Sequence, residues 1–233
     1  MGIARFVVFL FFALLLSQVL GALPIIGPLF ARTGIFGVWI AAMLLSWLVT
    51  KYGQRAVVAR RDRAELDRLE AVDSPYNHGK AGSVLLARGS AARALPHLET
   101  AAQGEPDSAE WQYRLGQALL MLRRPDDARR ALERCVSIDE EHAYGAAMLR
   151  LAEALVAESE GERALEVLAR AERNHGPSPE SAYRKGQALR ALGRKDEARK
   201  SFSEVSKLAS NAPKFQRRDA TAWATRAWLA RMF

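Results

Sequence analysis

The sequence predicts an all-α fold, a solenoid of about four helical hairpins, because two columns of small residues run in step along it. One column is an alanine that recurs at spacings of 34, 36 and 34 residues, and a second small residue precedes each alanine by twelve positions. Small residues at a period near 34 let two helices approach closely, and such helix pairs bury their apolar faces by stacking. The columns are Ala94, Ala128, Ala164 and Ala198, and Gly82, Gly116, Ala152 and Gly186.

Larger apolar residues stand where they would fill the volume around these columns. A leucine follows the first small residue of each unit by three positions, and a leucine or phenylalanine follows each alanine by four, one helical turn on. Short turns with glycine, proline or charges separate the helices, and Pro106 and Pro177 end repeats. The filling residues are Leu85, Leu119, Leu155, Leu189, Leu98, Leu132, Leu168 and Phe202.

Two of the units carry closely similar motifs. Residues 113–119 read YRLGQAL and residues 126–132 read DDARRAL, while residues 183–189 read YRKGQAL and are followed by DEA. This pattern resembles the tetratricopeptide repeat family over about residues 75–210, and the resemblance implies an array that binds proteins. The first unit departs from the pattern at His78 and Gly79, where bulky residues are expected, and the third has two extra residues.

The array is expected over residues 75–210 and a C-terminal capping helix over residues 211–233. An open solenoid end exposes its core, so a terminal unit needs a lid with a polar outer face. A basic aromatic helix that touches lipid headgroups or a partner is the alternative interpretation of this segment. The residues that can share one face of the helix are Phe215, Ala222, Trp223, Ala227 and Ala230.

Residues 1–50 predict a transmembrane anchor of two helices. Residues 6–22 and 34–50 are uncharged and largely apolar, and each is about as long as the shortest helix that spans a bilayer, about 17 residues. Prolines between the two runs favour a hairpin. Cleavage of the first run as a signal peptide is the alternative, although Leu20 is a poor match to the small residue that a cleavage site requires there.

Residues 51–74 predict a basic juxtamembrane helix or linker. Six basic residues lie between Lys51 and Arg68, whereas the predicted hairpin carries one, and positive charge near span ends is retained in the cytoplasm. The sequence therefore predicts a multi-pass protein of a bacterial inner membrane with its repeats facing the cytoplasm. An apolar stripe of Leu66, Leu69 and Val72 is expected to pack on the first repeat, with a dimer seam as the alternative.

The distribution of charge argues against a nucleic-acid partner. The net charge is +8, but residues 75–210 hold 21 basic and 20 acidic side chains of interspersed sign. A nucleic-acid groove needs a stripe of positive charge to neutralise phosphates. The excess positive charge lies in residues 1–74 and 211–233, where it suits an anionic leaflet.

The sequence contains no recognisable catalytic constellation, so it predicts neither an enzyme nor a cofactor or metal site. No pair among His78, His97, His142 and His175 shares a helix at metal-ligand spacing, and there is no HExxH motif, phosphate loop or nucleophile elbow. Cys135 is the only cysteine, which excludes an intramolecular disulfide, and its place in the repeat predicts a small core residue.

The resemblance implies that the first helix of each unit lines a groove for a protein or peptide ligand. Tyrosine and arginine often carry binding energy and methionine adapts to varied partners, although the tyrosines have an alternative role in packing between helices. One subclass of the family clamps chaperone tails with lysines and asparagines, but the corresponding groove positions of this sequence hold tyrosine and glutamine. The implied groove residues are Tyr113, Arg114, Gln117, Met121, Leu149, Arg150, Glu153, Tyr183, Arg184, Gln187 and Arg190.

The function predicted from these features is that of a membrane-anchored scaffold or adaptor, which recruits or organises partner proteins through the groove. One alternative is a structural subunit of a membrane complex that acts through its transmembrane helices. Another is an exported assembly factor of the cytochrome-maturation type.

Overall fold

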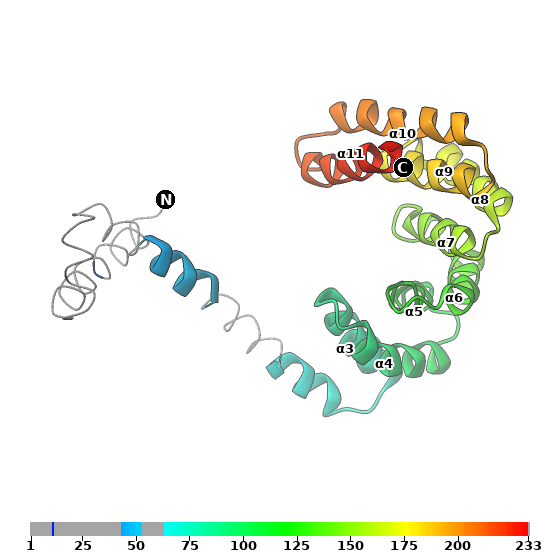
Figure 1. Ribbon diagram of the computed structural model, residues 1–233. Helices are drawn as coiled ribbons and strands as arrows, with labels where there is room; N and C mark the ends of the chain where they lie inside the picture. The colour runs from blue at the N-terminus through cyan, green and yellow to red at the C-terminus, as the bar shows by residue number, and fades with distance from the viewer. Residues whose placement is uncertain (1–10, 12–42, 53–62, 233) are drawn as a thin grey trace. The chain divides into compact units, whose positions relative to one another are not determined.

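The computed structural model describes residue 11 and residues 43–52 and 63–232, and every regular element in this part of the chain is a helix. The chain divides into two units, residues 1–65 and 66–233, and the second unit contains the repeats. The predicted all-α solenoid is confirmed (Figure 1). Its helices are α3 (Pro75–Ala87), α4 (Ala91–Gly104), α5 (Ala109–Met121), α6 (Pro125–Ile138), α7 (Ala146–Ala157), α8 (Gly161–His175), α9 (Pro179–Ala191), α10 (Lys195–Ser210) and α11 (Arg217–Met232).

Consecutive helices form four antiparallel hairpins that stack in chain order, α3–α4, α5–α6, α7–α8 and α9–α10 (Figure 1). The first helices of neighbouring hairpins also touch one another, since α3 contacts α5, α5 contacts α7 and α7 contacts α9. Within the described array the backbones of the second helices α4, α6, α8 and α10 make no such close approach. The hairpins are therefore closer together on the side of the first helices, and this side forms the inner face of the array.

The two columns of small residues lie where the helices of each hairpin cross. A Cβ added to Gly116 would stand 2.5 Å from Cγ of Leu132, and one added to Gly186 would stand 2.5 Å from Cε1 of Phe202. The alanine column is buried in every unit, as are the predicted filling residues. Glycine thus provides the space that the large side chain of the second helix occupies.

The first unit departs from the repeat pattern at Gly79 for a physical reason. A Cβ at this position would lie 2.6 Å from Cδ2 of Trp111, so the missing side chain makes room for an indole of the next unit. The segment before α3 also packs on this unit, because Leu66 is buried in one cluster with Leu85 and Leu98. The predicted packing of the apolar stripe holds at Leu66 and Leu69, whereas Val72 is exposed.

Helix α11 packs on the last hairpin, against both α9 and α10 (Figure 1). Its packed face contains Ala220 and Ala227, both buried, together with Trp223 and Ala230. The expected face is wrong at two positions, since Phe215 and Ala222 are exposed. Phe215 precedes the first turn of the helix, and the helical period starting at Arg217 directs Ala222 away from α9 and α10.

The predicted location in a bacterial inner membrane is wrong by the structure. Within the ranges that the structure describes, no helix combines the length and the apolar character needed to cross a bilayer. The two expected spans, 6–22 and 34–50, lie outside the described residues apart from Phe11 and residues 43–50, as do residues 53–62 of the expected juxtamembrane helix.

Candidate partner-binding groove

The inner face of the array contains a hollow of about 370 Å³ between α3, α5 and α7. All of the groove residues implied by the sequence lie on α5, α7 or α9, and five of them line this hollow. The five are Arg114, Gln117, Met121, Arg150 and Glu153.

The lining of the hollow is apolar on one side and charged on the other. Leu120 and Met121 of α5 meet Leu86 and Ala87 of α3, and the Met121 side chain is 52% exposed. Sequence reasoning missed the two α3 residues, although they precede Leu120 and Met121 by the repeat period of 34. The first unit departs from the family pattern, so the resemblance implies groove residues in units two to four alone.

The charged side of the hollow is held in place by ion pairs that cross from unit three to unit four. Arg150 donates to Glu153 at 2.8 Å and its guanidinium lies 3.4 Å from Glu180. Glu153 also pairs with Arg184 of α9 at 2.7 Å. Burial opposes the charge of Arg150, but the carboxylates of Glu180 and Glu153 outweigh it and raise the pKa of that guanidinium.

Arg114 is the less constrained guanidinium of the hollow. It donates to Glu110 at 2.7 Å, one turn back on the same helix, and both side chains are more than one third exposed. An exposed pair of this kind contributes about 0–1 kcal/mol, so its geometry adapts readily to a ligand. Arg114 and Arg150 therefore differ, one being adaptable and the other fixed.

Both predicted tyrosines pack between helices and lie outside the lining of the hollow. Tyr113 is buried, its ring meets that of His142 edge-on at 5.3 Å, and burial raises the pKa of its hydroxyl. Tyr183 lies between Phe202 and Trp223, with ring centroids 5.6 and 5.4 Å away. The geometry matches the packing role rather than direct contact with a ligand. Leu149 is likewise half-buried against the core.

Helix α11 covers the inner face of unit four. The Arg184 side chain is only 7% exposed, and its Cζ lies 5.3 Å from the ring centroid of Trp223. Arg190 reaches the carbonyl oxygen of Ala230 at 3.5 Å, and Gln187 bonds to its neighbours on α9. The structure therefore separates the α9 residues from the hollow that the α5 and α7 residues form.

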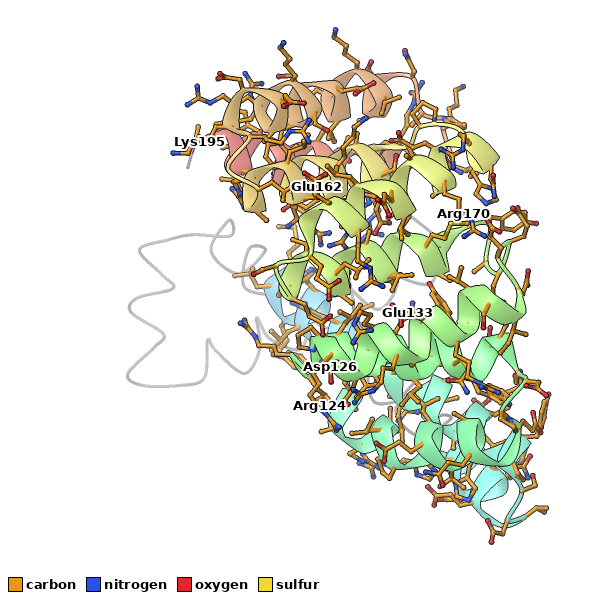
Figure 2. The ribbon with its side chains drawn as sticks, turned by 90° about the vertical axis from the view of Figure 1, so that its right-hand side faces the viewer. Arg124, Asp126, Glu133, Glu162, Arg170 and Lys195 are labelled. Carbon is orange, nitrogen blue, oxygen red and sulfur yellow. The ribbon has the colours of Figure 1, made fainter. Side chains whose placement is uncertain are left out.

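The outer face of the array carries charges of both signs in alternation (Figure 2). Glu133 of α6 accepts hydrogen bonds from Arg129 of the same helix at 3.1 Å and from Arg163 of α8 at 2.9 Å. Arg170 of α8 pairs with Glu140, just after α6, across the same boundary. These pairs tie neighbouring hairpins together and leave no single-sign stripe on this face.

Two observations concern the side chains of the described residues that could carry chemistry. Among them, no group of three or more histidine, cysteine, aspartate and glutamate side chains is arranged to hold a metal ion. Cys135 is buried in the core as predicted, and burial raises the pKa of its thiol to about 12. A thiol of this kind is a poor nucleophile at neutral pH because the thiolate is the reactive form.

These features define a helical-hairpin repeat protein with a hollow on its inner face. Two family models of the tetratricopeptide repeat match the chain, one at residues 85–147 and the other at residues 149–213. The chain belongs to the tetratricopeptide repeat family, as predicted. Proteins of this family generally mediate protein–protein interactions and are typically not enzymes.

Solved structures with the same fold include two of MamA. A MamA crystal structure is 23% identical with a TM-score of 0.56, and the match covers 66% of this chain and 84% of that one. The MamA RS-1 ArsTM double mutant is 19% identical with a TM-score of 0.58, and the match covers 71% of this chain and 96% of that one. The nearly identical TPR-like repeats of a Podosopora anserina protein are 18% identical with a TM-score of 0.56, and the match covers 73% of this chain and 93% of that one. Identities this low show a shared fold alone. None of the curated proteins matches the chain.

Proposed function

We propose that this chain is an adaptor that binds a peptide segment of a partner protein in the hollow between α3, α5 and α7. The observation that carries the proposal is the pairing of an apolar wall with two guanidinium groups in one accessible depression. Peptide grooves of helical scaffolds combine apolar pockets with a few fixed polar groups in this way.

The dimensions and charges of the hollow favour a particular kind of segment. A volume of about 370 Å³ lies at the small end of ligand pockets, roughly 300–1,000 Å³, and suits one or two large side chains. Arg114 and Arg150 contribute two positive charges, whereas Glu153 contributes one negative charge that Arg150 and Arg184 already share. The preferred segment therefore presents an apolar side chain beside a carboxylate.

Selection of displayed peptides against the purified full chain tests this proposal. The selected peptides should share an acidic residue next to a large apolar one, and their affinity is measured by calorimetry. Met121→Glu places a negative charge on the apolar wall and should weaken binding at least tenfold. Arg130→Ala is the matched control, since Arg130 lies on α6 outside the hollow and pairs with Asp126 and Asp127.

Two results would contradict the proposal. One is a set of selected peptides that bind the Met121→Glu variant as tightly as the unaltered chain. The other is a set that loses affinity equally with Arg130→Ala, which would place the site on the outer face. Salt dependence provides a further check, because a carboxylate contact with Arg114 weakens as ionic strength rises.

A further inference from the structure

Two histidines of the first hairpin direct the same ring nitrogen at one another. Nδ1 of His78 on α3 lies 3.0 Å from Nδ1 of His97 on α4, and the ring centroids are 5.2 Å apart. The side chains are 27% and 20% exposed, so the space between the rings is reachable from solvent. The pair lies apart from the hollow on the inner face, and the proposed peptide binding makes no use of it.

The opposite nitrogens of both rings face carboxylates from the segment that precedes α3. Nε2 of His78 is 2.9 Å from Asp73 Oδ1, and Nε2 of His97 is 3.8 Å from Glu70 Oε1. A neutral imidazole carries one N–H, and a carboxylate is an acceptor that holds this proton on the nitrogen facing it. Asp73 therefore leaves Nδ1 of His78 as a lone pair pointing at His97.

The neutral pair has two arrangements, which differ in the nitrogen of His97 that carries the proton. If His97 keeps its proton on Nε2, toward Glu70, then two Nδ1 lone pairs oppose each other at 3.0 Å. If His97 instead donates from Nδ1, it forms the 3.0 Å hydrogen bond to His78, and its bare Nε2 lies 3.8 Å from Glu70. A cation bound by both Nδ1 atoms would replace this hydrogen bond and leave an Nε2–H on each ring to face its carboxylate.

The spacing of the two Nδ1 atoms fits that of two ligands of one metal ion. Two ligands at right angles and about 2.1 Å from a metal are about 3.0 Å apart, which is the geometry of octahedral or tetragonal Ni²⁺ and Cu²⁺ sites. Carboxylates on the outer nitrogens of ligating histidines are the usual second layer of such sites.

We propose that His78 and His97 form a two-histidine site for a divalent late transition metal of the Ni²⁺ and Cu²⁺ class. Water completes the coordination, because no third metal-ligating side chain joins the pair within the described residues. A site with two protein ligands exchanges its metal readily. Occupation links α3 to α4 and fixes Asp73 and Glu70 against them, so it stabilises the first hairpin.

Calorimetric titration of the full chain, free of any histidine tag, with NiCl₂ tests the proposal. One ion should bind per chain, and His78→Gln and His97→Gln should each weaken binding at least tenfold. His175→Gln is the matched control, because this partly exposed histidine pairs with Glu141 on another hairpin and should leave Ni²⁺ affinity unchanged. Asp73→Asn keeps both ligands and should weaken binding about tenfold or more through the second layer.

Electron paramagnetic resonance of the Cu²⁺ complex counts the nitrogen ligands directly. Two imidazole nitrogens should couple to the metal in the unaltered chain and one in each glutamine variant, with thermal melts confirming that the variants fold. Saturable binding that persists in a His78→Gln, His97→Gln double variant would overturn the proposal. So would nitrogen-15 spectra in which a proton bridges the two Nδ1 atoms and Ni²⁺ has no effect.

Discussion

The close approach of α5 and α6 makes a quantitative prediction about Gly116. A methyl group added by Gly116→Ala would stand 2.5, 2.8 and 3.2 Å from the Cγ and two Cδ atoms of Leu132. Leu132 is fully buried, so its side chain cannot turn out into solvent. Overpacking of this kind costs about 1–3 kcal/mol, and the better helix propensity of alanine returns about 1 kcal/mol. We expect a net loss of stability of about 0–2 kcal/mol.

The sign of the effect should reverse when Leu132 is shortened. Leu132→Ala alone should cost about 2–5 kcal/mol, since it empties a buried site. The Gly116 methyl then has no atoms to clash with, and Gly116→Ala should stabilise this variant by about 1 kcal/mol through helix propensity. The coupling between the two substitutions should therefore be about 1–3 kcal/mol in favour of the double variant.

Urea denaturation of the four proteins, followed by circular dichroism, measures this coupling from the shifts in transition midpoint. Gly186 and Phe202 form the same contact in unit four and provide an independent repeat of the cycle. An equal loss from Gly116→Ala with and without Leu132→Ala would refute the reasoning, because it would show that contact with Leu132 is not what selects glycine.

Further predictions concern turns, ion pairs and the buried thiol. Arg123 and Ser159 have positive φ angles of 58° and 64°, so Arg123→Gly and Ser159→Gly should each stabilise the chain by about 0.5–1 kcal/mol, and a lower melting temperature would contradict this. Glu153→Gln removes a charge partner of the buried Arg184 and should cost about 1–3 kcal/mol in urea denaturation, whereas no change would show that Glu180 suffices alone. Cys135 should resist alkylation at pH 8 unless the chain is unfolded by urea. Because its folded pKa is raised from 9.0 to about 12, its contribution to stability is complete below pH 9 and is lost as pH rises toward 12, which melts across that range would reveal.

The repeat architecture was predictable because its cause is local and repeated. At the crossing of two helices only glycine or alanine leaves room for a leucine or phenylalanine, so the pattern of Gly82, Gly116 and Gly186 reports the helix pairs directly. The hollow was predictable in part, since the first helices of units two and three supply it. Leu86 and Ala87 could not be predicted from the family motif, because their unit departs from it at His78 and Gly79, although the 34-residue period does point to them.

Contacts between distant segments could not be predicted from the sequence. The covering of Arg184 by Trp223 depends on where α11 begins and on how it packs against α9 and α10. The pairing of His78 and His97 has no signal in helical spacing, because these residues lie 19 positions apart on two helices of a hairpin. The apolar composition of the amino-terminal residues predicted membrane spans, but none of the described helices is long and apolar enough to cross a bilayer.

One column of arginines shows how the same position acquires different roles along the array. Arg114, Arg150 and Arg184 occupy equivalent places on α5, α7 and α9, and their side chains are 36%, 29% and 7% exposed. Arg114 pairs with one carboxylate, whereas Arg150 and Arg184 each pair with two, and Arg184 also meets the indole of Trp223. The enclosed guanidinium of Arg184 holds units three and four together, whereas the exposed guanidinium of Arg114 remains accessible from solvent. The gradient therefore supports the proposal that a ligand binds at the open end of the inner face, while the end that α11 covers contributes stability.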